Sequence, residues 1–257
     1  MQWSEAQMLE WVARFFWPFL RIGAFFVAMP IFNSRSVPLR VRLILALAVT
    51  LAVMPSLPPV AEADLLNLSA VLVAVRELVI GIAMGFVLQL AFAALVFAGQ
   101  NIAYSMGLGF AAMIDPQLGV QVPLISQLYL LFATLFFLGL DGHLVMIDML
   151  AAGFQTLPPG LEGLAREDLW TLVRWSSGVF SGGVLLSLPI VIALLFVNMA
   201  LGIATRAAPQ LNIFSVGFPI TLLLGLALIW LRLPAILQRF AGTLPATYEL
   251  ILKLLRA

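Results

Sequence analysis

Leu78-Val-Ile-Gly-Ile-Ala-Met-Gly-Phe-Val-Leu-Gln-Leu-Ala-Phe-Ala-Ala-Leu-Val-Phe97 is a predominantly apolar stretch inside a longer apolar run over residues 71–99. A helix needs about 20 such residues to cross a bilayer, so this stretch predicts a membrane-spanning helix. The remaining apolar runs lie at 11–32, 43–57, 122–140, 183–205 and 213–233. The sequence therefore predicts an all-α membrane protein with six apolar segments.

The composition also indicates a protein embedded in a membrane. Of the 257 residues, 63% are hydrophobic and 10% are charged, whereas soluble domains average about half apolar and a quarter charged. The chain contains no cysteine, which excludes disulfides, thiolate metal sites and thiol catalysis. Its net charge of +1 gives no indication of nucleic-acid binding.

Charges in the connections conflict with a simple six-span bundle. The loop 33–42 carries three arginines, the tail 234–257 has three basic residues and one acid, and the connection 141–182 is acidic. The positive-inside rule places both basic segments in the cytoplasm. Five apolar segments separate them, however, and an odd number of crossings would put them on opposite sides. Either one segment does not cross, or the helices pack within a larger assembly, which we favour.

Polar and small residues recur at helical spacing inside two of the apolar runs. They are Glu77, Gly81, Gly85 and Gln89 in the third run, and Asn198, Gly202 and Arg206 in the fifth. Small and amide side chains at this spacing let membrane helices approach closely and hydrogen-bond to one another. We interpret these stripes as packing faces, with a proton relay through Glu77 as the alternative.

Arginines and prolines interrupt other apolar runs. Arg14 and Arg21 lie seven residues apart, on one face of the first predicted helix. Because arginine within a bilayer is costly, we expect both side chains to face protein or headgroups. Pro189 and Pro219 each remove a helix hydrogen bond, which predicts kinked or broken helices.

One connection is neither a typical helix nor a typical surface loop. The stretch Met106-Gly-Leu-Gly-Phe-Ala-Ala-Met-Ile-Asp-Pro-Gln-Leu-Gly119 is rich in glycine and yet apolar. Irregular backbone at membrane depth must be buried in protein or line a cavity, because lipid cannot satisfy free N–H and C=O groups. The stretch is therefore a candidate element for lining or closing a pore. The alternative is a short connector at the level of the headgroups.

No pattern typical of a catalytic centre occurs in the sequence. His143 is the single histidine, and the chain has no G-x-S-x-G, H-E-x-x-H or P-loop motif. The nearby acids Asp141 and Asp148 lack the spacing of zinc ligands. We therefore predict a non-enzymatic protein with no catalytic residue, no metal and no cofactor.

Five sequence blocks, in this order, resemble the FliR family of bacterial type III export-gate proteins, which includes injectisome relatives. The blocks lie at 21–47, 77–86, 98–119, 141–158 and 206–219. The last of them, Arg206-Ala-Ala-Pro-Gln-Leu-Asn-Ile-Phe-Ser-Val-Gly-Phe-Pro219, is the most specific. The resemblance covers nearly the whole chain.

The resemblance implies a subunit of the flagellar export gate, in the bacterial inner membrane at the flagellar basal body. A single copy would join several FliP and FliQ copies in a helical, ring-like assembly with FlhB as a neighbour, and unfolded flagellar proteins would pass through it. Kinked helices and helical hairpins would then pack on sister subunits more than on membrane lipid. The resemblance further implies a FliP-like helical part at 1–175 and a FliQ-like hairpin at 176–257.

The resemblance also assigns roles to individual residues. The family's channel plug matches the 106–119 stretch, whose glycines would let it move aside. The predicted plug residues are Met106, Gly107, Leu108, Gly109, Phe110, Met113, Ile114, Asp115 and Pro116. The predicted subunit-packing residues are Arg14, Arg21, Glu77, Gly81, Gly85, Gln89, Asn198, Arg206, Pro209 and Asn212. For the last three, a capping and turn role within the chain is favoured over a joint to FliQ or FlhB.

Other functions are open at this point. A free-standing secondary transporter or channel would have a broken-helix substrate site and would act alone in vesicles. A membrane-embedded enzyme would need a cluster of histidines or carboxylates at one cavity, which the single histidine disfavours. An injectisome subunit would share the family, although the block 206–219 favours a flagellar one.

Overall fold

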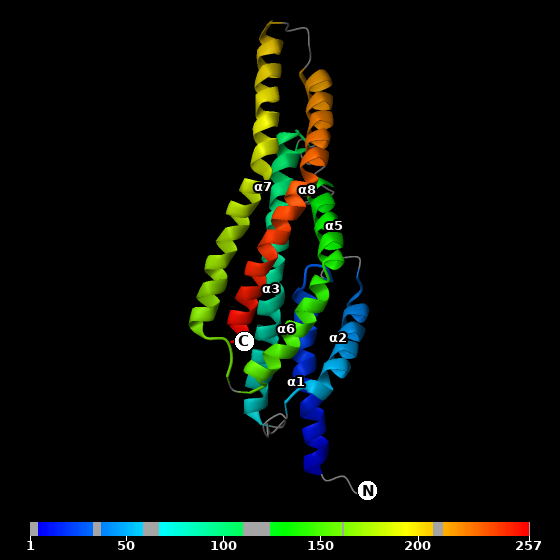
Figure 1. The fold of residues 1–257 in the computed structure, drawn as a ribbon, viewed down its shortest axis with the longest axis vertical. Coiled ribbons are helices and arrows are strands. Elements are labelled where there is room, and N and C mark those ends of the chain that lie inside the picture. The colour runs from blue at the N-terminus through cyan, green and yellow to red at the C-terminus, as the bar shows by residue number, and fades with distance from the viewer. Residues whose placement is uncertain are drawn as a thin grey trace. The chain divides into compact units, whose positions relative to one another are not determined.

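In the part that the structure describes, the chain folds into helices joined by short connections (Figure 1). The computed structural model describes residues 5–32, 37–58, 67–109, 124–160, 162–207 and 213–256, with backbone only for 5–10 and 213–215. These residues include no strand, which confirms the all-α prediction. The helices are α1 (Glu5–Ala28), α2 (Leu39–Val53), the 3₁₀ turn η1 (Met54–Ser56), α3 (Leu68–Ser105), α5 (Leu124–Gly139), α6 (Gly142–Thr156), α7 (Arg166–Ala207) and α8 (Ile213–Leu255).

Several helices are long and apolar enough to cross a membrane. Five helices have the length and the apolar composition needed to cross a membrane. α5 and α6 together make a sixth if they are counted as one broken span. The five segments are Trp11–Ala28, Leu39–Ser56, Leu68–Ser105, Arg166–Ala207 and Val216–Leu255. The chain is therefore a membrane protein, as its composition predicts.

The apolar runs do not predict one of the helices, α6. α6 lies inside the acidic connection 141–182. Its buried residues recur every three or four positions, which is the pattern of an amphipathic helix and not of an unbroken apolar run. They are Gly142, Met146, Met149, Leu150, Gly153 and Phe154. The chain enters α6 at Asp141, whose φ of 56° is in the left-handed region.

The two longest helices extend beyond the runs that predicted them. α7 begins at Arg166 rather than near 183, and α8 continues to Leu255 rather than ending near 233. Acidic residues in the first turn of α7 favour its early start through the helix dipole. Pro189 lies inside α7 and Pro219 inside α8, and neither proline ends its helix. The helices are therefore not broken at these prolines, and a kink at either proline stays a prediction.

Two compact units share the long helices. Unit 1 comprises 1–90, 137–175 and 244–257, whereas unit 2 comprises 91–136 and 176–243. α3, α7 and α8 therefore each contribute one part to unit 1 and another to unit 2. These units group residues by contact, so the predicted division into parts 1–175 and 176–257 stays a prediction.

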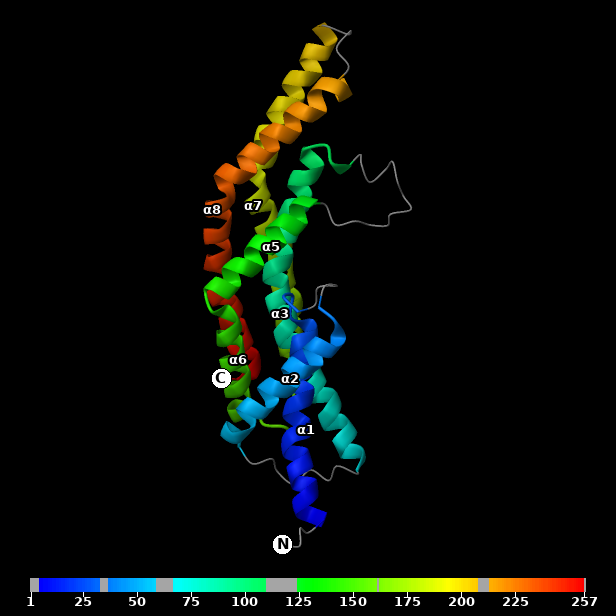
Figure 2. The same ribbon diagram turned by 90° about the vertical axis from the view of Figure 1, so that its right-hand side faces the viewer.

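In unit 1, α1 contacts α2 and the first half of α3 (Figure 2). Its core consists mainly of large side chains with almost no exposed surface. They include Trp17, Ile22, Phe25, Met29, Ile80, Met84 and Phe154.

In unit 2, the end of α3 packs against α5, α7 and α8. The rings of Phe92 and Phe240 meet edge to face with centroids 5.0 Å apart, and those of Phe97 and Phe180 do so at 5.5 Å. On the α5 side, the Ser126 hydroxyl donates to the carbonyl of Val96 at 3.0 Å. The end of α3 is thus enclosed by other helices of the same chain.

Candidate functional site

A buried ion pair lies at the centre of unit 1. Arg21 of α1 donates from Nε to Glu77 Oε2 at 2.7 Å and from Nη2 to Glu77 Oε1 at 2.9 Å. Both residues have 0% of their surface exposed. Such paired bonds fix the guanidinium relative to the carboxylate. Glu77 is the counter-ion of Arg21, which favours its packing interpretation over a proton relay.

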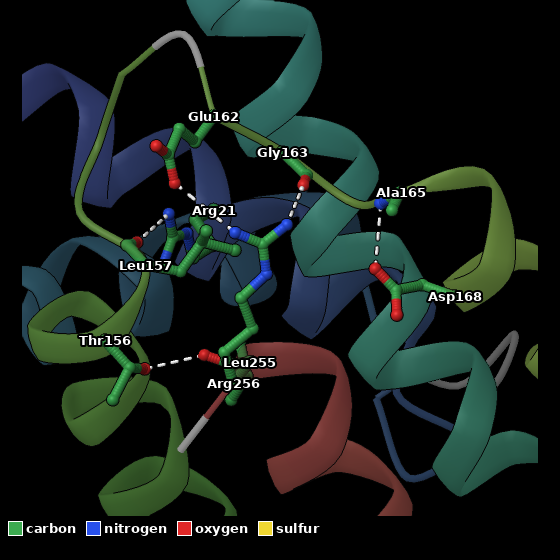
Figure 3. A network of polar contacts seen from close by, with 9 residues as sticks. All are labelled: Arg21, Thr156, Leu157, Glu162, Gly163, Ala165, Asp168, Leu255 and Arg256. Carbon is green, nitrogen blue, oxygen red and sulfur yellow. Dashed lines mark hydrogen bonds and ion pairs between the residues drawn. The ribbon is translucent and has the colours of Figure 1, made fainter.

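The same guanidinium caps the end of α6. Arg21 Nη1 donates to the carbonyl of Gly153 at 3.2 Å. Arg21 Nη2 donates to the carbonyl of Leu157 at 2.9 Å (Figure 3). Its Cζ lies 4.2 Å from the centroid of the Phe154 ring. The last carbonyls of a helix lack partners within the helix, and the helix dipole favours a cation there. Arg21 therefore joins α1, α3 and α6.

Glycines of α3 bring that helix close to α1. A Cβ added at Gly81 would collide with the backbone oxygen of Arg21, and one at Gly85 would lie 2.6 Å from the Cβ of Ala28. The structure thus places the first three residues of the predicted stripe against α1 of the same chain. Gln89, the fourth, is half-buried. Contacts of this stripe with other subunits stay a prediction.

The connection from α6 to α7 is held by the C-terminal end of α8 (Figure 3). The Thr156 hydroxyl donates to the carbonyl of Leu255 at 2.7 Å. Arg256 Nη2 donates to the carbonyl of Gly163 at 3.3 Å, and Nη1 pairs with Glu162 at 3.3 Å. Arg21 and the end of α8 therefore fix the connection from two helices.

In unit 2, α3 ends in a defined cap where the predicted plug begins. Gly107 has a φ of +85°, which suits glycine. Its N–H donates to the carbonyl of Tyr104, and the N–H of Leu108 donates to that of Ala103, both at 3.0 Å. This pair of bonds is the Schellman motif, which terminates helices.

Side chains of α7 and α8 bond the next two carbonyls of this cap. Asn198 Nδ2 donates to the carbonyl of Ser105 at 3.3 Å, and Thr221 Oγ1 donates to that of Met106 at 3.2 Å. The Met106 side chain is buried against Gly225, where an added Cβ would lie 2.6 Å from Met106 Cγ. The last carbonyls of α3 thus have hydrogen-bond partners, and the predicted plug segment starts from this cap.

The remaining predicted plug and packing residues are partly described by the structure and partly outside the described residues. Leu108 and Gly109 follow the cap and are half-buried, and Arg14 on α1 is half-buried too. Arg206 is exposed in the last turn of α7, where the helix dipole favours a cation. The residues that lie outside the described part are Phe110, Met113, Ile114, Asp115, Pro116, Pro209 and Asn212. In the described part, no three histidine or acidic side chains are placed to hold a metal ion.

The sequence analysis predicts neither the pairing of Arg21 with Glu77 nor the residues of α8 that contact the end of α3. Arg21 and Glu77 were each predicted to pack, but their pairing was not, although opposite charges in two apolar runs could have indicated it. Thr221 and Gly225 were not predicted at all. A hydroxyl and a glycine one turn apart in the sixth run were the available signal.

Comparison with known proteins gives one consistent result. Residues 12–246 match the family described as bacterial export proteins, family 1. The flagellar biosynthetic protein FliR of Escherichia coli is 41% identical over 236 residues, covering 92% of this chain and 90% of that protein. FliR of Bacillus subtilis is 34% identical over 207 residues, 79% of each chain. FliR of Aquifex aeolicus is 33% identical over 220 residues, 85% of this chain and 84% of that one.

Proposed function

The chain belongs to family 1 of the bacterial export proteins, and from that premise we propose that it is a non-enzymatic core subunit of the flagellar export gate. One copy forms, with FliP and FliQ and beside FlhB, the channel through which unfolded flagellar proteins cross the inner membrane. The observation that carries this proposal is the 41% identity to a flagellar biosynthetic protein across nearly the full length of both chains. The relatives named above are all flagellar proteins, which favours the flagellar gate over an injectisome.

The exposed apolar surface of α7 and α8 supports the proposal that this chain is part of a larger assembly. Within the chain, 56% of the most apolar part of α3 is buried, against 17% for α7 and 22% for α8. Exposed apolar faces of this extent are covered by lipid or by other protein. Neighbouring gate subunits would cover much of α7 and α8.

Closure of the channel is assigned to the 106–119 segment. Its support is the cap at Gly107, which fixes where the segment begins, and its content of methionine and phenylalanine. Flexible apolar side chains suit a seal that must re-form, and an apolar constriction blocks ions by dewetting. Replacing 110–116 with a polar linker, with the cap at 106–109 retained, should raise ion leakage through the assembled gate. Unchanged leakage would overturn this assignment.

The test of the whole proposal is co-expression with FliP and FliQ. Native mass spectrometry should find this chain as one copy in a stable complex, and the chain should restore swimming to Escherichia coli lacking its own FliR. A monodisperse protein that ignores both partners and transports a solute in vesicles would instead establish the transporter alternative.

The same complex resolves the role of Arg206. We assign it to the end of α7, so Arg206→Ala should leave both assembly and export close to normal. A variant that assembles and yet abolishes export would place Arg206 at a joint to FliQ or FlhB instead.

A further inference from the structure

We propose that Gly139, Gly178 and Gly242 act as hinges at which the chain bends where it passes between unit 1 and unit 2. The chain makes this passage after Leu90, Phe136, Trp175 and Thr243. Each of the three glycines lies close in sequence to one of the last three passages. The first passage, in α3, has no glycine beside it.

Neither packing nor backbone conformation requires glycine at these three positions. A Cβ added at Gly139, Gly178 or Gly242 would have nothing within 4 Å. Among the described residues, the glycine with a positive φ is Gly107 and not one of these three. Glycine within a helix is also less favourable than alanine, because it loses more backbone freedom on folding. What glycine supplies at the passages is therefore ease of bending.

Glycines inside the units mostly have the opposite surroundings. A Cβ added at Gly81 in unit 1, or at Gly99 or Gly225 in unit 2, would collide with another segment of the same unit. Those glycines are explained by close packing. Gly23 and Gly202 lie inside a unit and yet have nothing within 4 Å of an added Cβ, so they are the natural controls for the three hinge positions.

Side-chain hydroxyls accompany the two glycines that lie within continuous helices. In α7, Gly178 follows Ser177, and pairs of glycine and serine are among the usual places where helices bend. The Ser181 hydroxyl donates to the carbonyl of Gly178 at 3.3 Å, and in α8 the Thr243 hydroxyl donates to that of Phe240 at 2.7 Å. Such bonds compete with the hydrogen bonds of the helix and often bend it. A carbonyl that loses its helical partner on bending keeps a donor nearby.

The other two passages differ in how they allow a bend. α5 ends at Gly139 and α6 begins at Gly142, so no continuous helix resists bending there. α3 is continuous, and its residues 86–98 contain no glycine. A helix at the axis of a bend needs only the gentle curvature that long helices have, whereas helices away from the axis must change their path length. α3 is thus the pivot, and the glycines let the other passages adjust.

The absence of cysteine allows pairs of spin labels to measure this bending. Glu249→Cys in unit 1 and Phe196→Cys in unit 2 label exposed positions on either side of the passages. Glu249→Cys with Leu72→Cys, both in unit 1, is the reference pair. Double electron–electron resonance on the purified full chain should give a broader distance distribution between the units than within unit 1. This measurement does not depend on the proposed export function.

Alanine substitutions test the glycines themselves. The triple variant Gly139→Ala/Gly178→Ala/Gly242→Ala should narrow the distribution between the units to the width of the reference pair, because each alanine lowers the bent population by about fivefold. The double variant Gly23→Ala/Gly202→Ala should leave the width unchanged. A distribution that is already as narrow as the reference pair, or that the triple variant does not narrow, would overturn the proposal. An unchanged width with loss of co-purified FliP or FliQ would show that these exposed glycines pack against a neighbouring subunit instead.

Discussion

At the scale of single residues, the ion pair of Arg21 and Glu77 is the most consequential contact of unit 1. Glu77→Ala would leave a buried guanidinium without its counter-ion, which costs about 3–5 kcal/mol in other buried pairs. We expect a loss of that size in the free energy of unfolding, measured by denaturation of the purified protein in detergent. The double variant Arg21→Met/Glu77→Leu should be more stable than Glu77→Ala, because it leaves no unpaired charge.

Glu249→Ala is the matched control. Glu249 is an exposed acid of unit 1, on α8, and its removal should change the free energy of unfolding by less than about 0.5 kcal/mol. Equal losses at positions 77 and 249 would show that the ion pair has no special role.

The sequence predicts that Arg21 faces protein or headgroups and that Glu77 lies on a packing face, but not that the two side chains meet. Arginine in an apolar run must be sheltered, which is a local argument. Pairing depends on how α1 and α3 pack, because the two residues are 56 positions apart in the sequence, and neither apolar run specifies that packing. The further bonds of Arg21 to Gly153 and Leu157 depend on α6, a helix that the apolar runs did not predict.

At the scale of helices, the close packing of α3 on α1 depends on Gly81. A methyl group there would collide with the Arg21 backbone, so Gly81→Ala should cost about 1–3 kcal/mol through overpacking. Gly23→Ala on the facing helix is the control, because nothing lies within 4 Å of an added Cβ. It should be neutral or stabilise α1 by up to about 1 kcal/mol. Thermal denaturation of both variants compares them directly, and a Gly81→Ala protein as stable as Gly23→Ala would refute the close approach.

The cap at the end of α3 can be tested by substituting Gly107. Gly107→Ala forces alanine into the left-handed region, which costs about 1–2 kcal/mol. Gly202→Ala, inside α7 with open space around it, should not destabilise the protein. Hydrogen exchange of the amides of Gly107 and Leu108 should accelerate only in the first variant. Unchanged exchange there would mean that the Schellman bonds do not hold the cap.

Helices were predictable where an apolar run is long and uninterrupted, as in α3. Where burial alternates with exposure, as in α6, only the spacing of Met146, Leu150 and Phe154 carries the information. Helix ends were predicted poorly because the dipole of α7 and the packing of Leu254 and Leu255 in α8 extend them past the apolar runs. The cap at Gly107 was predicted only as a flexible glycine.

At the scale of the whole molecule, both units are built from segments distant in sequence. Unit 1 contains the beginning of the chain and also its end, residues 244–257. Such an arrangement cannot be read from apolar runs, because each run specifies a helix and not its neighbours. It implies that unit 1 is incomplete until the last turn of α8 has been synthesised.

Truncation at the C-terminus tests that dependence. Leu254 and Leu255 are 2% and 0% exposed, and burial of one leucine side chain is typically worth about 2–5 kcal/mol against alanine. Ending the chain after Lys253 should therefore sharply reduce its accumulation in membranes and expose the 157–165 connection to protease. Arg256→Ala removes an ion pair whose side chains are 46% and 81% exposed, so its loss should cost no more than about 1 kcal/mol. If the two changes were equally harmful, polar bonds and not apolar burial would hold the end of α8. If neither were harmful, unit 1 would close without it.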